Sequence, residues 1–166
     1  PVEQEGTYKL PEAQLDRFMF NLWLDYPSSD EEISIVKATT TQFKPDVKAA
    51  MNAAEINGFQ DLVRRVPVAD NVIQYAVKLV RSTRPQNDSS KIVKDFLNYG
   101  AGPRASQYLI LGAKTRAALQ GRFSPEIEDV RAIAASVLRH RIVANFNAEA
   151  DNISPSDIVA KLMKEM

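Results

Sequence analysis

The sequence predicts a mainly α-helical fold, in which one short helix and one strand precede a helical bundle. Beyond residue 28, apolar side chains recur at the three- and four-residue spacing of amphipathic helices. Several segments begin with serine, aspartate or proline followed by acidic residues, which is a typical helix start. The strand is predicted because residues 20–26 alternate apolar and polar side chains with a two-residue period.

The first predicted elements lie between residues 11 and 26. Residues 11–18 begin with proline and carry Glu12 in the first turn, which favours a short helix. Residues 20–26 follow as the strand. Because a single strand is not stable alone, it either completes a sheet whose other strands are absent or pairs outside the chain.

The bundle is expected to begin directly after the strand. Ser29 is predicted to cap a helix together with Glu32, three residues later, as a capping box. Residues 45–56 and 59–66 are predicted to form two short helices, because the asparagine–glycine pair between them is a typical helix end.

The later helices also have recognisable starts. A long helix is expected from a cap at Asp70, and residues 85–98 are expected to form a loop with one helical turn. The strongest helical periodicity covers residues 104–122. The last two helices share one device, a serine cap followed by proline, at Ser124 and Ser154.

The stretch NYGAGPRASQ, residues 98–107, places an arginine where a helix is expected to begin. Proline suits the first helical position, so Arg104 falls in the first turn. A cation there is disfavoured by roughly 0.3–1 kcal/mol, because the free N–H groups and the macrodipole make that end positive. Either the arginine is simply solvated, or an anion binds beside it.

The composition excludes several classes of function. Lys plus Arg and Asp plus Glu each total 21, so no overall positive field draws the chain to nucleic acid or an anionic membrane. There is no cysteine and the single histidine is His140, which removes disulfides, zinc clusters and most histidine-based catalysis. Without a membrane-length apolar run or a signal segment, a cytoplasmic location is expected. The start at Pro1 suggests a piece of a longer protein.

The chain has no phosphate-binding loop of its own. A P-loop needs a glycine followed by lysine, and none of the six glycines precedes one. The acidic run at residues 30–32 is better explained by a first helical turn, where carboxylates complement the macrodipole, than by metal binding or acid–base catalysis. No metal site is therefore predicted.

Two isolated basic groups have ordinary structural explanations. His140 lies in VLRHRI near a predicted helix end, where a structural role is expected. The basic residues 139–141, together with the arginines at 64–65, make only a weak case for nucleic-acid binding, since interleaved aromatics are lacking. Arg17 lies near the end of the first short helix, where a cation is favoured and where Asp16 or Glu12 could pair with it.

Taken together and in order, PVEQEGTYKLPEAQLDRFMF, GAGPRAS and VLRHRI resemble the MoxR-type AAA+ ATPases over nearly the whole chain. In that family the first segment carries the arginine finger and the second carries the sensor-2 arginine. By position, the resemblance implies that Arg17 is a catalytic finger acting in trans. It implies that Arg104 is sensor 2, acting in cis, with Gly102 and Pro103 beside the nucleotide.

The resemblance also implies a division of the chain. Residues 1–27 would be the C-terminal remnant of an α/β ATPase core, with the finger helix and the last strand. Residues 28–166 would form a helical AAA+ lid carrying sensor 2. The phosphate loop, the Walker-B carboxylates and the sensor-1 residue would precede Pro1. ATP and Mg²⁺ are therefore expected in the intact parent and not on this chain alone, which is predicted to be inactive.

The implied partners are neighbouring protomers of a homo-oligomeric ring, expected to be a hexamer, and client proteins that the ring remodels or matures, including proteins with von Willebrand A domains. No nucleic acid and no membrane span are expected. Two residues depart from the family pattern: Gly102 replaces a serine and Lys9 replaces a proline. The residues also leave open a non-catalytic helical interaction module and, more weakly, a nucleic-acid-binding bundle.

Overall fold

The computed structural model of the chain describes residues 10–42, 45–86 and 89–166. The chain divides into two compact units. Unit 1 comprises Pro1–Asn21 and Leu62–Met166, and unit 2 comprises Leu22–Asp61. Lys9 and the stretch before it, which contribute to the family resemblance, lie outside the described residues.

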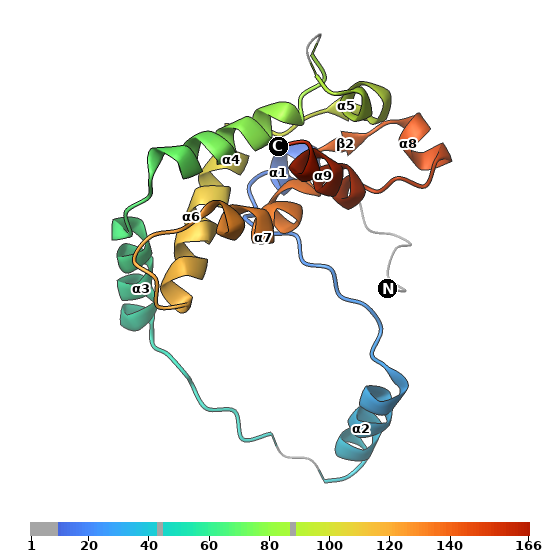
Figure 1. The fold of residues 1–166 in the computed structure, drawn as a ribbon. Helices are drawn as coiled ribbons and strands as arrows, with labels where there is room; N and C mark the ends of the chain where they lie inside the picture. Colours follow the sequence, from blue (N-terminus) through green and yellow to red (C-terminus); the bar gives the residue numbers. More distant parts are fainter. Residues whose placement is uncertain (1–9, 43–44, 87–88) are drawn as a thin grey trace. The chain divides into compact units, whose positions relative to one another are not determined.

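The predicted mainly helical fold is confirmed (Figure 1). Helix α3, Ala53–Arg65, runs across the boundary between the units, and α2, Ser29–Thr39, belongs to unit 2. The remaining elements belong to unit 1: α1 Glu12–Leu15, α4 Asp70–Ser82, α5 Lys91–Phe96, β1 Leu97–Tyr99, α6 Pro103–Leu119, α7 Ile127–Leu138, β2 Val143–Ala144, α8 Phe146–Ala150 and α9 Pro155–Lys164.

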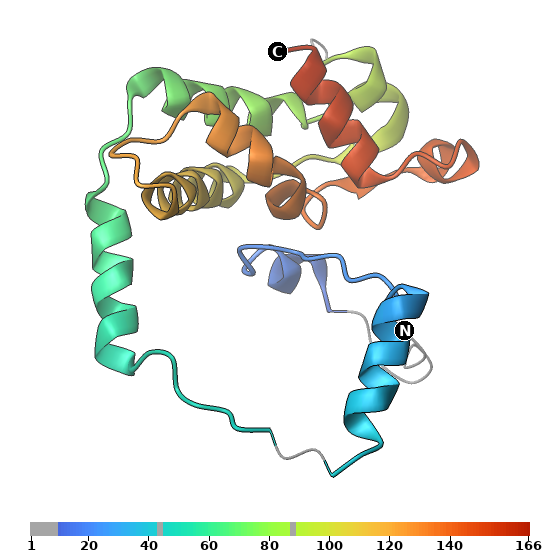
Figure 2. The same ribbon diagram turned by 60° about the horizontal axis from the view of Figure 1, so that its bottom comes forward.

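Helices α4, α6, α7 and α9 pack together in unit 1 (Figures 1 and 2). The hydrophobic core of the unit lies among them. Its largest side chains are at most 2% exposed, and they are Leu79, Leu109, Leu138, Ile158 and Leu162. Fully burying a side chain of this size stabilises a fold by about 1.5–3 kcal/mol. This core therefore fixes α6 and α7, the two helices that present the candidate site.

Small residues allow α6 to pack closely against its neighbours. Ala105, Ala113 and Ala117 lie at helical spacing and are fully buried. A Cβ on Gly112 would lie 2.5 Å from Ile133 Cδ1 of α7, so a larger residue here would displace the end of the Ile133 side chain. Small side chains on α6 therefore let α7 pack closely against it.

An ion-pair cluster fixes the connection from α6 to α7. Asp129, 2% exposed, accepts from Arg122 at 2.5 and 2.7 Å and pairs with Arg116 at 3.2 Å. It also accepts from the backbone N–H of Glu126 as part of a capping box. The hydrogen bonds from Arg122 are the main reason that the pKa of Asp129 is lowered.

The helix starts were predicted with mixed success. Ser154 caps α9 in a capping box and Pro103 occupies the first position of α6, so both predictions are confirmed. The predicted caps at Asp70 and Ser124 are wrong. Asp70 is the first residue of α4, and Ala69 is its N-cap. α7 begins later than predicted, and Glu126 and Asp129 form its capping box in place of the predicted serine.

In unit 2, α2 begins one residue earlier than predicted. Ser28 is the cap and Glu31 completes the capping box, so the Ser29–Glu32 assignment is wrong. Ser28 Oγ donates to Glu31 at 2.7 Å, and this hydrogen bond is the main cause of the lowered pKa of Glu31. No side chain of α2 is buried.

The predicted break in the next helix is also wrong. α3 continues through Asn57-Gly58, while residues 45–52 that the structure describes are not helical. Reciprocal hydrogen bonds between Asn52 and Glu55, at 2.8 and 3.0 Å, secure its start. Mid-helix glycine is unfavourable by only about 1 kcal/mol, which a secured start can offset.

The strand predicted at residues 20–26 does not form; this stretch is irregular. Alternation indicates two faces, but a strand also needs a neighbouring strand, and no described strand pairs with this stretch. The sheet that does form is antiparallel and joins β1 to β2, with Leu97 opposite Ala144 and Tyr99 opposite Val143. The single helical turn predicted at residues 85–98 corresponds to α5.

Candidate functional site

The loop before α6 is fixed against the end of α4. Thr83, fully buried, accepts from the backbone N–H of Ala101 at 2.9 Å, and Arg84 Nε donates to the carbonyl of Ala101 at 3.0 Å. A Cβ on Gly100 would lie 2.4 Å from the carbonyl oxygen of Thr83, so only glycine allows this approach. Gly102 differs, because its Cβ would meet nothing within 4 Å. These contacts set where α6 starts.

Arg104 lies in the first turn of α6, as predicted, and its charge is met by a carboxylate. Arg104 Nη1 donates to Asp16 Oδ2, from a residue 88 positions earlier. The Arg104 side chain is 42% exposed and the Asp16 side chain 32%. The arginine is therefore neither simply solvated nor fully buried, and the anion beside it comes from the chain itself.

Asp16 also binds a second arginine, Arg141, just beyond the end of α7. Arg141 Nε donates to Asp16 Oδ1 at 3.0 Å, and Nη2 donates to the Asp16 carbonyl at 2.9 Å. The Arg141 side chain is only 1% exposed. Burial is the main cause of its lowered pKa, and the hydrogen bond with Asp16 opposes that shift.

Arg141 holds the backbone that follows α1. Its guanidinium donates to the carbonyls of Phe18 and Met19 in addition to Asp16, and to the carbonyl of Val137 in the last turn of α7. Satisfying several carbonyls with one buried cation compensates for the burial of its charge. The segment 16–19 is thereby tied to the C-terminal end of α7.

Tyr108 of α6 completes this attachment. The Arg141 guanidinium carbon lies 5.0 Å from the Tyr108 ring centroid, a cation–π distance. The Tyr108 hydroxyl donates to the carbonyl of Arg17 at 3.0 Å. Both α6 and the turn directly after α7 therefore contact the short segment that carries the predicted finger.

Arg17 itself occupies the turn after α1 and is exposed. Its predicted pairing with Asp16 or Glu12 is not seen: within residues 10–42, 45–86 and 89–166, its guanidinium has no ion pair or hydrogen bond. Asp16 is turned instead toward Arg104 and Arg141. The backbone of Arg17 is thus anchored while its side chain remains available.

His140 makes a structural contact, as predicted, but with a distant carbonyl rather than with the end of its own helix. Its Nε2 lies 3.0 Å from the carbonyl oxygen of Phe18. Its Nδ1 is buried and has no hydrogen-bond partner in the part of the chain that the structure describes. Burial is the main cause of the lowered pKa of His140.

The sequence interpretation singled out Arg17, Arg104 and their neighbours Gly102 and Pro103, and it missed Arg141. Gly102 is the N-cap of α6 and supplies no side-chain cap; Pro103 follows it. The sequence did offer a signal for Arg141, because this arginine lies between two apolar residues, Leu138 and Ile142, which are buried in the structure. An arginine in an apolar run is expected to have a carboxylate or carbonyl partner.

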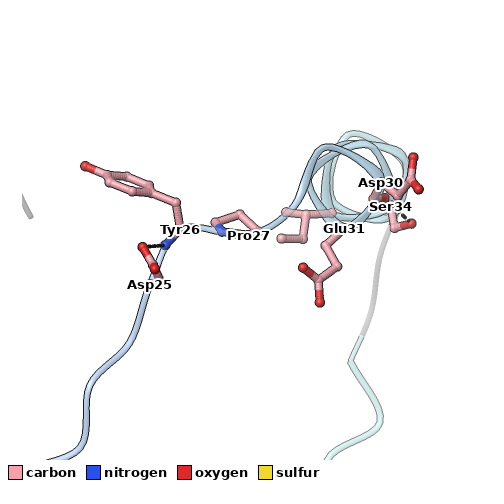
Figure 3. A pocket seen from close by; sticks show the side chains of 7 residues that line it. Asp25, Tyr26, Pro27, Asp30, Glu31 and Ser34 are labelled. Atoms are coloured by element: carbon pink, nitrogen blue, oxygen red, sulfur yellow. Dashed lines mark hydrogen bonds between the residues drawn. The ribbon is translucent and has the colours of Figure 1, made fainter.

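The acidic run of unit 2 borders a shallow surface hollow (Figure 3). Figure 3 shows Asp25, Asp30 and Glu31 pointing in different directions, with Asp25 bonded to the backbone of Tyr26. Among the described residues no group of three or more His, Cys, Asp or Glu could hold a metal ion. No described helix combines the length and apolar character needed to cross a membrane.

Comparison with known proteins gives the chain a family context. Residues 89–162 match the AAA lid domain family. The chain is 34% identical to chaperone MoxR1 of Mycobacterium tuberculosis, with 99% of this chain and 44% of that protein covered. It is also 34% identical to the uncharacterized protein YeaC of Bacillus subtilis, with 98% of this chain and 49% of that protein covered.

A solved structure agrees with these relatives. The crystal structure of a candidate ATPase from Cytophaga hutchinsonii has a TM-score of 0.89 and 32% identity, covering 100% of this chain and 51% of that one. The chain thus spans 44% and 49% of the two curated relatives described above. The lid match lies within a chain that is similar to a MoxR protein along nearly its whole length, so the chain resembles the MoxR-type AAA+ ATPases and fits their lid-bearing C-terminal part.

Proposed function

We propose that this chain is the C-terminal portion of an ATP-hydrolysing ring in which Arg104 binds the nucleotide of its own protomer and Arg17 acts on the neighbour's nucleotide. One observation carries the proposal. Two guanidinium groups are accessible: that of Arg104, which Asp16 binds, and that of Arg17, the residue after Asp16, in a segment whose backbone Arg141 anchors.

The two arginines would serve different steps. A cation at the N-terminal turn of α6 can bind a phosphate together with the helix N–H groups, so Arg104 would report nucleotide occupancy to the lid. Gly102 and Pro103, directly before it, would lie beside that nucleotide. An arginine inserted from a neighbour stabilises the charge that spreads over the transferred phosphoryl group, which is the role proposed for Arg17.

ATP and Mg²⁺ are proposed ligands of the intact parent. Phosphoryl transfer needs a phosphate-cradling loop and carboxylates that hold Mg²⁺, and two arginines alone do not organise these groups. The chain by itself is therefore expected to be inactive. Residues 1–27 are proposed to belong to the ATPase core and residues 28–166 to the lid.

Ring assembly and clients extend the same proposal. One relative is named a chaperone, which supports a role in remodelling or maturing partner proteins. The proposed partners are neighbouring protomers in a hexameric ring and client proteins, including some with von Willebrand A domains, in the cytoplasm. Because the chain contains both proposed arginines, tilting of the lid would couple neighbouring sites.

A subunit-mixing experiment with the intact parent tests the trans assignment. Arg17→Ala protomers and protomers disabled in the Walker-B acid are each expected to be inactive alone. In mixed rings some sites combine an intact Walker-B acid with an intact finger from the neighbour. A trans finger contributes on the order of 10³–10⁵ in rate, so partial activity should return.

The control mixes two separately prepared samples of the Walker-B variant, which should stay inactive. Exchange of protomers is verified by mass spectrometry of the mixed rings. Mixed rings that form but hydrolyse no more ATP than either variant would remove the catalytic assignment of Arg17.

A further inference from the structure

Asp16 receives one hydrogen bond from Arg104 and one from Arg141 on its two carboxylate oxygens. We propose that Asp16 is a positioning residue: it holds the Arg104 guanidinium at the start of α6 so that the remaining donors face a nucleotide phosphate. This inference rests on the proposed nucleotide contact of Arg104. Asp16 touches no nucleotide itself and acts through Arg104.

The charges of Asp16, Arg104 and Arg141 favour a role for Asp16 in positioning Arg104 over a role in neutralising it. One carboxylate lies between two guanidinium groups, so a positive charge is left over. The Arg141 side chain is 1% exposed, whereas that of Arg104 is 42% exposed. The accessible part of the excess charge therefore belongs to Arg104, where an anion from solution can reach it.

The hydrogen-bond geometry leaves donors for that anion. Arg104 uses Nη1 for Asp16, and a guanidinium carries five N–H donors in a planar fork. Among the described residues, Nε and Nη2 of Arg104 have no hydrogen bond. One edge of the fork can thus be held by Asp16 while another binds a phosphate oxygen.

Asp16 is itself held in place. Arg141 binds both its side chain, at 3.0 Å, and its carbonyl, at 2.9 Å. Arg104 is thereby ordered by a chain of contacts that begins at a buried residue. Ordering a long side chain before the ligand arrives lowers the entropic penalty of binding, so loss of Asp16 should weaken nucleotide affinity about 3- to 10-fold.

A double-mutant cycle in the intact parent tests the inference, with the Kd of ATP measured under non-hydrolysing conditions. Asp16→Asn keeps the size of the side chain but removes its charge. It should raise the Kd about 3- to 10-fold when Arg104 is present and should change it less than twofold in an Arg104→Ala background. Asp61→Asn, at an exposed position of α3, is the matched control and should leave the Kd unchanged.

Each outcome separates the two proposals. An Arg104→Ala variant with wild-type Kd would overturn the proposed nucleotide contact. Suppose instead that Arg104→Ala raises the Kd. Then an Asp16→Asn change with no effect on the Kd, or with an equal effect in the absence of Arg104, would overturn only the positioning role. If Asp16→Asn does not fold, Asp16→Glu replaces it, because it keeps the charge beside Arg141 but displaces the carboxylate. A wild-type Kd for Asp16→Glu would also overturn the inference.

Discussion

Unit 1 and unit 2 both contain helices with side-chain caps, yet only unit 1 has a buried core among the described residues. Every buried hydrophobic side chain identified in the described residues lies in unit 1. In unit 2, α2 has a complete capping box and no buried side chain, and Leu24 is 91% exposed. Capping therefore decides where a helix begins, whereas burial decides whether it contributes to a cooperative fold.

The candidate site follows the same division. Asp16, Arg104 and Arg141 are all in unit 1, where α6 and α7 are fixed by the core. Their geometry depends on residues that are far apart in the sequence, with Asp16 and Arg141 separated by 125 positions. Substitutions that break long-range contacts should thus affect the whole unit, whereas substitutions at a local cap of unit 2 should not.

The largest expected effect is that of Arg141→Ala. Its removal leaves Asp16 without its buried partner and takes donors from the carbonyls of Phe18 and Met19. Breaking a buried, hydrogen-bonded ion pair typically costs about 3–5 kcal/mol. Urea denaturation of the chain should show a loss of this size in the free energy of unfolding.

Arg139→Ala is the matched control. The Arg139 Nε donates to the carbonyl of Ala135, one turn earlier on the same helix, at 3.1 Å. Its loss should change the free energy of unfolding by less than about 1 kcal/mol. Equal losses for the two variants would show that Arg141 contributes no more than an ordinary surface arginine.

Two glycines of one loop should respond oppositely to the same change. Gly100→Ser places a Cβ 2.4 Å from the Thr83 carbonyl oxygen, and overpacking of this kind costs about 1–3 kcal/mol. Gly102→Ser has open space and restores a side-chain cap to α6, which should stabilise by a few tenths of a kcal/mol, roughly. Thermal unfolding of both variants checks the prediction. It would be contradicted if the Tm of both variants rose or if both fell.

The fold was predictable from the sequence wherever a local signal was sufficient. Pro103 at the first position of α6 and the Ser154 cap were both predicted, because proline and serine act within one helical turn. The strand at residues 20–26 was not, because alternation does not say whether a pairing partner exists. Short elements such as β1 and β2 carry too few residues for a period to be visible.

The candidate site was predictable only in part. The first-turn position of Arg104 followed from the proline before it, and the question of its anion followed from the helix macrodipole. The anion beside Arg104 is Asp16, which lies 88 positions earlier in the chain. Tertiary packing brings the two together, and no local sequence pattern encodes it. The burial of Arg141 depends likewise on how α6, α7 and the segment 16–19 come together.

Two serine caps offer a direct test of the contrast between the units. Ser28 and Ser154 make the same capping box, but α9 has buried Ile158 and Leu162 whereas α2 has no buried side chain. Each Ser→Ala change should remove about 1 kcal/mol of helix stability. Ser154→Ala should therefore lower the Tm of the main unfolding transition.

Ser28→Ala should leave that Tm unchanged and accelerate amide hydrogen exchange within α2 alone, by about fivefold. Hydrogen exchange followed by mass spectrometry separates the two responses. A lower main Tm for Ser28→Ala would mean that α2 unfolds together with unit 1.

The smallest expected effect is the pH dependence that His140 gives to unit 1. Its pKa is lowered in the fold mainly by burial; Arg141 and Arg139 also oppose its charge, whereas the Phe18 carbonyl and Asp16 favour it. Since the folded pKa lies below the ordinary value of 6.5, the unfolded chain binds the proton more readily. The stabilising contribution is thus complete above that value and is lost as the pH falls through the folded pKa.

Protonation would place a second N–H donor at Nδ1, where the described residues provide no acceptor. His140→Gln retains an N–H donor for the Phe18 carbonyl and cannot titrate, so its Tm should vary less than that of the wild type between about pH 7.5 and 5.5. The lowered pKa of Glu31 places the corresponding local loss in α2 below its ordinary 4.5, outside this range. A wild-type Tm that rises as the pH falls would mean that Asp16 stabilises the charged imidazole more than burial and the two arginines oppose it.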